Sequence, residues 1–122
     1  MLKNLLIVSI PVSNQDEAID FYVNKLGLEK RTDVPMGEGM RWIEVAPPGA
    51  QTALVLAKGG CGAIQDRIGK FTGHIFATDD IQTTYETLKS RGVHFTEPPR
   101  VEPWGKWAQF VDQDGNGFGL KE

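Results

Sequence analysis

The sequence contains little of what several common protein classes require. It has a single cysteine, Cys61, so no internal disulfide can form, and a reducing, cytoplasmic setting is expected. Its longest apolar run, residues 5–10, is far shorter than the roughly 18 residues that span a bilayer. The formal net charge is −3 without any basic stripe, so nucleic acid and anionic membranes are not expected partners.

Two further features favour an ordinary globular protein. Residues 1–4 lead straight into a strand-like run and do not resemble a secretory signal. Cys61 lies in the glycine-rich stretch 59–62, and we interpret it as a loop thiol because the sequence places no base beside it.

The chain repeats itself once, at a spacing of about 65 residues. Each half begins with a strand-like run followed by an amphipathic helix: 5–12 and 16–26, then 73–78 and 81–90. Both helices follow Ser, Asn or Asp residues, which cap free backbone N–H groups, and both end at a glycine, Gly27 or Gly92. Three more strand-like runs follow each helix: 28–32, 42–45 and 52–57, then 93–96, 107–110 and 118–121.

The pattern therefore predicts an α+β fold of two tandem βαβββ modules. We expect module one at 1–57, a glycine-containing linker at 58–70 and module two at 71–122. One helix can cover only one face of a four-stranded sheet, so the other face must meet a partner module or line a cavity.

Several motifs give the chain a resemblance to the vicinal-oxygen-chelate superfamily, which includes glyoxalase I, extradiol dioxygenases, fosfomycin-resistance proteins and bleomycin-binding proteins. The motifs that carry the resemblance are Ile10-Pro11-Val12-Ser13, 18–22 with Lys25-Leu26-Gly27, Asp79-Asp80-Ile81, 88–93, Pro103-Trp104-Gly105 and 112–116. The resemblance implies eight strands that form a cupped sheet around a cavity. One departure is Gln113, where the family usually has proline.

Enzymes of this superfamily hold a divalent metal such as Zn, Ni, Mn or Fe through side chains on the first and last strand of each module. The resemblance maps these positions to Ile7, Leu54, Gly73 and Gly119, none of which can coordinate a metal. No metal or other cofactor is therefore expected. His74 lies one residue from the ligand register, and strand alternation turns it toward the helix, so it stays a weak candidate ligand.

Strand alternation assigns the strand residues to two faces. The face packed on the helices is predicted to hold Leu6, Val8, Ile10, Val12, Ile43, Val45, Ala53, Val55, Phe76, Ala108, Phe110, Phe118 and Leu120. The opposite face collects Ile7, Ser9, Trp42, Glu44, Leu54, Leu56, Gly73, Ile75, Trp107, Gln109 and Gly119. Apolar walls, room left by glycines and a few polar groups are typical of a small-molecule site.

From these faces we select a candidate ligand-binding set of Ser9, Trp42, Leu54, Ile75, Trp104, Trp107 and Gln109. The repeat mates Trp42 and Trp107 either stack a flat or cationic ligand or fill the core between modules. Glu44 is a catalytic base, a partner for a cation or a solvated carboxylate. Trp104 resembles an aromatic residue that borders the groove of bleomycin-binding relatives, and the alternative is a loop anchor.

Three functions remain open. The first is a metal-free protein that sequesters a drug or metabolite, as bleomycin-resistance proteins do. The second is a metal-dependent lyase of the lactoylglutathione lyase kind or an extradiol dioxygenase. The third is a metal-free enzyme with Glu44 or His74 as the base. Because superfamily chains of this length commonly pair, we expect a homodimer whose cavities are shared between chains.

Overall fold

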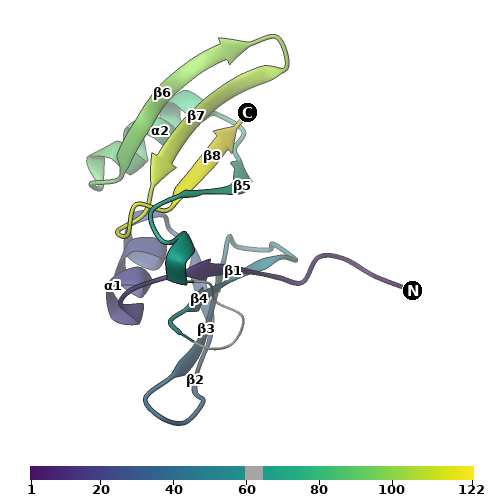
Figure 1. The fold of residues 1–122 in the computed structure, drawn as a ribbon. Helices are drawn as coiled ribbons and strands as arrows, with labels where there is room; N and C mark the ends of the chain where they lie inside the picture. The colour runs from purple at the N-terminus through teal and green to yellow at the C-terminus, as the bar shows by residue number, and fades with distance from the viewer. Residues whose placement is uncertain (60–64) are drawn as a thin grey trace. The chain divides into compact units, whose positions relative to one another are not determined.

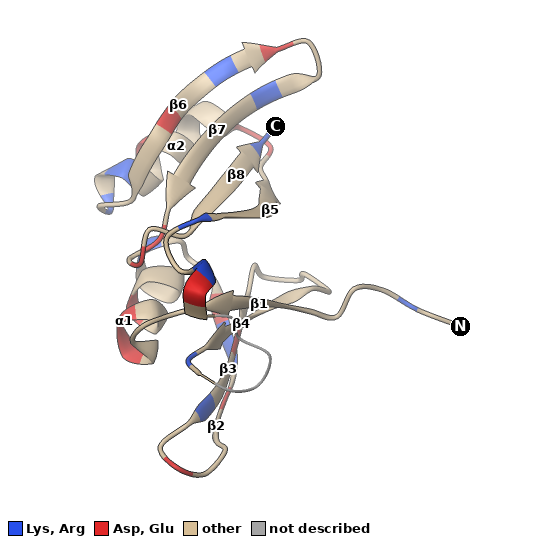
Figure 2. Ribbon diagram, in the orientation of Figure 1, with Lys and Arg blue, Asp and Glu red and all other residues tan. Residues whose placement is uncertain are grey.

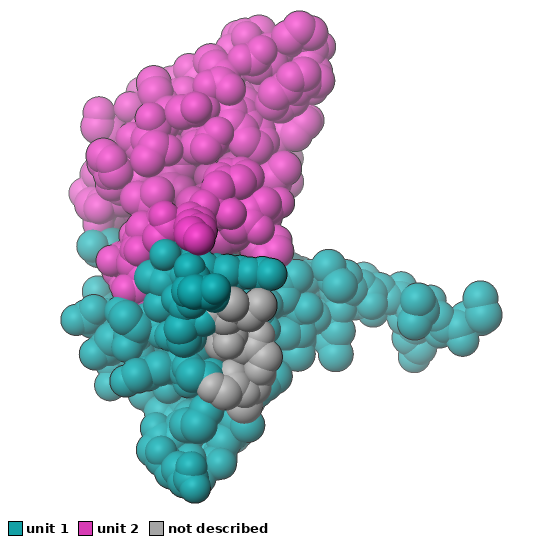
Figure 3. Space-filling model, viewed as in Figure 1, with its two compact units in different colours: residues 1–68 teal, residues 69–122 magenta. Residues whose placement is uncertain are grey.

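The computed structural model describes residues 1–59 and 65–122. The chain divides into two compact units, residues 1–68 and 69–122 (Figure 3). Each unit has its own sheet and its own helical segment.

Unit 1 contains a four-stranded mixed sheet in the order β1-β4-β3-β2 (Figure 1). Its elements are β1 (Ile7–Pro11), α1 (Gln15–Ile19), the π-helical segment η1 (Asp20–Lys25), β2 (Glu29–Pro35), β3 (Arg41–Ala46) and β4 (Ala53–Ala57). Strands β1 and β4 are parallel, and the other two pairs are antiparallel. A short 3-10 helix, η2 (Gln65–Arg67), follows.

Unit 2 repeats this topology, with the sheet order β5-β8-β7-β6 and β5 parallel to β8. Its elements are β5 (Phe71–Ala77), α2 (Ile81–Ser90), β6 (His94–Glu102), β7 (Gly105–Val111) and β8 (Gly117–Lys121). Helix α2 lies against β6 and β7 on one face of the sheet (Figure 1). The predicted tandem of βαβββ modules is therefore confirmed.

The helix boundaries follow the predicted capping chemistry. The side chains of Asn14 and Asp80 accept hydrogen bonds from the backbone N–H groups of Glu17 and Thr83, at 2.9 and 3.0 Å. The glycines at the other ends, Gly27 and Gly92, have φ of 81° and 93°, a conformation that costs glycine nothing.

Three local features differ from the sequence-based predictions. The first helix becomes π-helical after Ile19, so residues 16–26 are not one α-helix. Strand β6 continues through Pro98 and Pro99, which is tolerated because β6 is an edge strand with one unpaired side. Leu6 was assigned to the helix-packed face, but it precedes β1 and is exposed.

The core of unit 2 is built from aromatic rings. Phe110 stacks against Phe76 and Phe118, with ring centroids 6.0 and 5.6 Å apart, and also contacts Phe95. Tyr85 of α2 meets Phe95 edge to face at 4.7 Å, which fixes the helix to the sheet. Of these residues, Phe76, Phe110 and Phe118 are the ones that strand alternation assigned to the face toward the helix.

The turn between β7 and β8 is held by its own side chains. One oxygen of the buried Asp112 accepts hydrogen bonds from the backbone N–H groups of Asp114 and Asn116, at 2.8 and 2.9 Å. The amide oxygen of Asn116 accepts from Gly69 N–H at 2.9 Å. The turn is fixed without the proline that the superfamily usually has at position 113.

We expect the Phe110→Ala variant to lose about 3–5 kcal/mol of unfolding free energy, because it leaves a cavity among three phenylalanines. Urea denaturation followed by far-UV circular dichroism measures the loss. Val101→Ala is the matched control on the neighbouring strand: Val101 is 81% exposed, so the expected change is within about 0.5 kcal/mol. Equal losses in the two variants would contradict this description of the core.

Candidate functional site

The candidate site in unit 2 is the sheet face opposite α2, which we call the open face. Along β5, Phe71, Gly73, Ile75 and Ala77 are exposed, whereas the residues between them are partly covered. Ile75 pairs with Gly119 of β8, and Gly119 pairs with Gln109 of β7. These three residues form a row across the open face.

An indole covers the centre of this row. Trp107 leans from β7 over Gly119, and its Nε1–H donates a hydrogen bond to the Oε1 atom of Gln109 at 3.0 Å. A Cβ atom on residue 119 would lie 2.2 Å from the Cη2 atom of Trp107. The benzo ring of Trp107 therefore rests directly on the backbone of β8.

Trp104 stands beside this indole. The two rings meet edge to face, with centroids 5.4 Å apart and planes at 74°. Trp104 comes from the turn between β6 and β7 and is 53% exposed. Together Trp104 and Trp107 form a corner of two indoles, which can contact a planar ring on its face and on its edge at once.

Phe71 belongs to the same open face, although the sequence reasoning missed it. Phe71 lies against Gly117, where an added Cβ atom would be 3.1 Å from the Phe71 Cδ1 atom. The sequence feature that could have placed Phe71 on this face is the pair of alternating glycines in β8, Gly117 and Gly119. Glycines on one face of a strand make room for aromatic rings from neighbouring strands.

His74 points to the other side of the sheet. The centroid of its ring lies 6.5 Å from the ring centroid of Phe118, which belongs to the aromatic core. Burial lowers the pKa of His74, which favours the neutral imidazole. His74 therefore lies on the sheet face of the aromatic core and not on the open face.

Unit 1 has a similar hydrogen-bonded pair on the sheet face that holds Trp42 and Glu44, which we call the open face of unit 1. The Nε1–H of Trp42 donates a hydrogen bond to the Oε2 atom of Glu44 at 2.7 Å, two residues along β3. Trp107 and Gln109 repeat this arrangement in unit 2, with an amide in place of the carboxylate. Of the other residues selected in unit 1, Ser9 is exposed and Leu54 is buried.

Two polar side chains fix β3 of unit 1, next to Trp42. The guanidinium of Arg41 binds both carboxylate oxygens of Asp33, at 3.0 and 2.7 Å, and one oxygen of Asp16 at 2.7 Å. The buried amide of Gln15 donates to the backbone oxygens of Arg41 and Leu56, both at 2.9 Å. Arg41 is thus engaged by two carboxylates, which gives it a structural role rather than contact with an anionic substrate.

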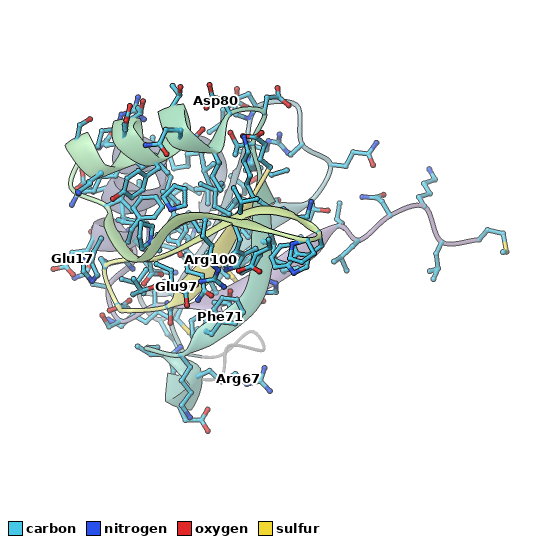
Figure 4. All side chains as sticks on the ribbon, turned by 90° about the horizontal axis from the view of Figure 1, so that it is seen from above. Glu17, Arg67, Phe71, Asp80, Glu97 and Arg100 are labelled. Atoms are coloured by element: carbon cyan, nitrogen blue, oxygen red, sulfur yellow. The ribbon has the colours of Figure 1, made fainter. Side chains whose placement is uncertain are left out.

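A hollow in unit 2 has a volume of about 240 Å³, and its lining comes from α2, β6 and β7: Ile81, Gln82, Pro99, Arg100, Val101 and Lys106. Its two cations are already paired. Arg100 binds Glu97, which lies next to it in Figure 4, and also Glu102. Lys106 lies 3.2 Å from Glu122. Figure 2 shows charges of both signs spread over both units. The pairing leaves this hollow without net positive charge that would attract an anion.

The residues present do not fit the divalent metal that superfamily enzymes use. Of the four corresponding positions, Ile7 and Leu54 are aliphatic, Gly73 has a φ of 80°, and Gly119 lies beneath Trp107. Within residues 1–59 and 65–122, no three His, Cys, Asp or Glu side chains are grouped to hold a metal. We derive no chemistry from such an ion.

Comparison with known proteins identifies the family. The model of the Glyoxalase/Bleomycin resistance protein/Dioxygenase superfamily matches residues 4–120 of the chain. The chain belongs to this superfamily. A superfamily structure from Sphaerobacter thermophilus DSM 20745 is 42% identical, with a TM-score of 0.90, and the match covers 99% of this chain and 98% of that one.

Two other relatives are similar over almost their whole length. The protein YetH of Bacillus subtilis (strain 168) is 38% identical over 122 residues, which cover 100% of both chains. TnmS3, an antibiotic binding protein from Streptomyces sp. CB03234, is 38% identical with a TM-score of 0.86, and the match covers 98% of this chain and 95% of that one.

The structure brings some of the predicted site residues together within each unit. In unit 2 the open face holds Trp104, Trp107, Gln109 and Ile75. In unit 1 the indole of Trp42 donates a hydrogen bond to Glu44. Cys61 lies outside the described residues. Among the described helices of this superfamily member, none has the length and apolar character needed to cross a membrane.

The ion pair beside Trp42 predicts a pH dependence of stability. The Arg41 guanidinium lowers the pKa of Asp33. The ion pair therefore stabilises the folded state above about pH 4, and this stabilisation is lost as the pH falls through the lowered pKa of Asp33. The stability difference between the wild type and Asp33→Asn should therefore shrink between about pH 5 and pH 3.

Urea denaturation across this pH range measures the difference. The comparison with Asp33→Asn is needed because backbone amides of α2 also lower the pKa values of Asp80 and Glu122, so the wild type loses stability at acid pH for several reasons. A difference that stays constant with pH would mean that Asp33 contributes nothing through its charge.

Proposed function

We propose that this chain is a binding protein that sequesters a small organic molecule, a drug or a metabolite, on its open sheet faces without a metal ion. The observation that carries the proposal is the indole corner of Trp104 and Trp107 on the sheet face that also holds the exposed Ile75 and Phe71. Exposed apolar groups gathered on one face of a sheet are typical of a ligand or partner surface. The likeness to TnmS3, described as an antibiotic binding protein, supports the same function.

The chemistry of this face suits binding by stacking and a few hydrogen bonds. A planar ring placed on an indole gains dispersion and quadrupole interactions of about 0.5–1.5 kcal/mol beyond the area it buries. Gln109 orients the indole of Trp107, and its amide NH2 group carries donor hydrogens for a ligand carbonyl. In unit 1 the Glu44 carboxylate offers the matching group for a ligand cation or donor.

The two enzymatic alternatives have less support from the described residues. A metal-dependent lyase or dioxygenase needs several protein ligands at positions that hold Ile, Leu and Gly here. A metal-free enzyme needs a base beside the substrate, but His74 faces the aromatic core and Glu44 is bonded to Trp42. Neither observation favours proton transfer over binding.

A fluorescence titration tests the proposal. We expect at least one compound in a panel of small metabolites and antibiotics to quench tryptophan emission saturably, because the indoles of the open faces would contact it. Trp107→Phe should weaken the binding of that compound roughly tenfold, which corresponds to about 1.4 kcal/mol. A wild type that binds nothing in a broad panel would contradict the proposal.

Metal analysis of the purified protein distinguishes metal-free binding from metal-dependent catalysis. Protein purified without a chelator is analysed for Zn, Ni, Mn and Fe, and the titration is repeated after each ion is added. We expect less than stoichiometric metal and unchanged ligand affinity. A stoichiometric ion whose removal abolishes ligand binding would favour the enzyme instead.

We also propose that two copies pair, so that ligand cavities are shared between the chains, and we retain the predicted cytoplasmic setting. The exposed apolar side chains support pairing: Leu5 and Leu6 in unit 1, and Phe71, Ile75 and Trp104 in unit 2. Size-exclusion chromatography with light scattering should give about 27 kDa, twice the 13.5 kDa of one chain. A mass of about 13.5 kDa at micromolar concentration would rule out a stable dimer.

A further inference from the structure

Residue 119 is a glycine because a side chain there has no room, not because its backbone conformation requires glycine. Its φ lies outside the left-handed region, unlike that of Gly73 at 80°, so the backbone at 119 accepts any L residue. What it does not accept is a side chain. An added Cβ atom would lie 2.2, 2.8 and 2.9 Å from the Cη2, Cζ2 and Cζ3 atoms of Trp107. Real Cβ atoms essentially never approach another heavy atom so closely.

The indole cannot move aside without losing its other contacts. Its Nε1–H is bonded to Gln109, and its ring meets the edge of Trp104 at a centroid distance of 5.4 Å. A methyl group at residue 119 would push the benzo ring away from β8 and break one or both of these contacts. The position of Trp107 therefore depends on the missing side chain at residue 119.

We infer that Gly119 is the residue that determines ligand specificity on the open face of unit 2. By letting the Trp107 indole lie flat on β8, it turns the outer face of that ring into a platform beside the Trp104 wall. A platform and wall of this kind select planar aromatic ring systems over non-planar molecules of the same size and charge. The inference rests on the proposed binding function and specifies its ligand class.

Gly117 provides a matched control on the same strand and the same face. It lies two residues from Gly119, and its φ is also outside the left-handed region. An added Cβ atom at 117 would lie 3.1 Å from the Cδ1 atom and 3.2 Å from the Cα atom of Phe71, so Phe71 must shift by a few tenths of an ångström, and its three nearest atoms all belong to Phe71 rather than Trp107. Gly117→Ala therefore adds the same methyl group without disturbing the indole corner.

The first arm of the test measures the indoles without any ligand. The edge-to-face pair of Trp104 and Trp107 should give a coupled near-ultraviolet circular dichroism signal that Trp104→Phe removes. We expect Gly119→Ala to reduce this signal and to raise quenching by acrylamide, while Gly117→Ala retains both wild-type values. In a Trp107→Leu background Gly119→Ala should have no further effect. Unchanged spectra in Gly119→Ala, with the chain folded, would overturn the inference.

The second arm measures selection with defined probes. 9-Aminoacridine serves as a planar aromatic cation and 1-adamantanamine as a compact, non-planar cation. We expect the wild type to bind 9-aminoacridine more tightly, and Gly119→Ala to reduce this preference at least tenfold while Gly117→Ala retains it. If the wild type binds but Gly119→Ala keeps the preference, the inference alone fails. If the wild type binds neither this probe nor the metabolite panel, the proposed function fails with it.

Discussion

Each sheet of this chain has two faces but only one helix to cover them, and the two-residue period of a strand divides the side chains between those faces. In unit 2 the face toward α2 receives phenylalanines that stack into a core, Phe76, Phe110 and Phe118. The other face keeps exposed apolar groups that no element of the same unit covers, Phe71, Ile75 and Trp104. The same constraint that builds the core therefore leaves a surface available for a ligand.

That constraint explains how much of the fold the sequence could predict. The repeat, the caps at Asn14 and Asp80 and the glycines after each helix are local signals, and the elements that they delimit are present. The π-helical turn after Ile19 and the length of β6 depend instead on tertiary packing and on the edge position of that strand, so local patterns did not show them.

The candidate site shows the same division. The alternation of strand residues was sufficient to predict that His74 lies toward the core and Trp107 on the open face. It could not show that Trp107 leans diagonally from β7 to Gly119 of β8, or that Phe71 lies against Gly117, because such contacts depend on side-chain direction between strands. The buried amide of Gln15, which joins α1 to the backbone of β3 and β4, also gave no sequence signal, since an isolated glutamine is usually exposed.

Both units contain a hydrogen bond from a tryptophan indole to a side-chain acceptor, but the acceptor is charged in only one of them. An indole bonded to an acceptor two residues along the third strand occurs in both, but the acceptor is the carboxylate of Glu44 in unit 1 and the amide of Gln109 in unit 2. A carboxylate beside an exposed aromatic face suits a cation, whereas an amide suits a neutral polar group. Each unit therefore presents a recognition surface of its own polarity, acidic in unit 1 and neutral in unit 2.

Position 119 links this recognition chemistry to the superfamily background. A side chain that reached a metal from residue 119 would pass through the volume that the Trp107 indole occupies. Coordination from this position and a flat indole on β8 therefore exclude each other sterically, whatever residues stand at Ile7, Leu54 and Gly73. A change from metal chemistry to stacking would need no rearrangement of the sheet, only the replacement of the ligand side chains and the movement of a neighbouring ring into the space left at residue 119. Functional divergence within one fold is then a matter of a few side chains on the open face.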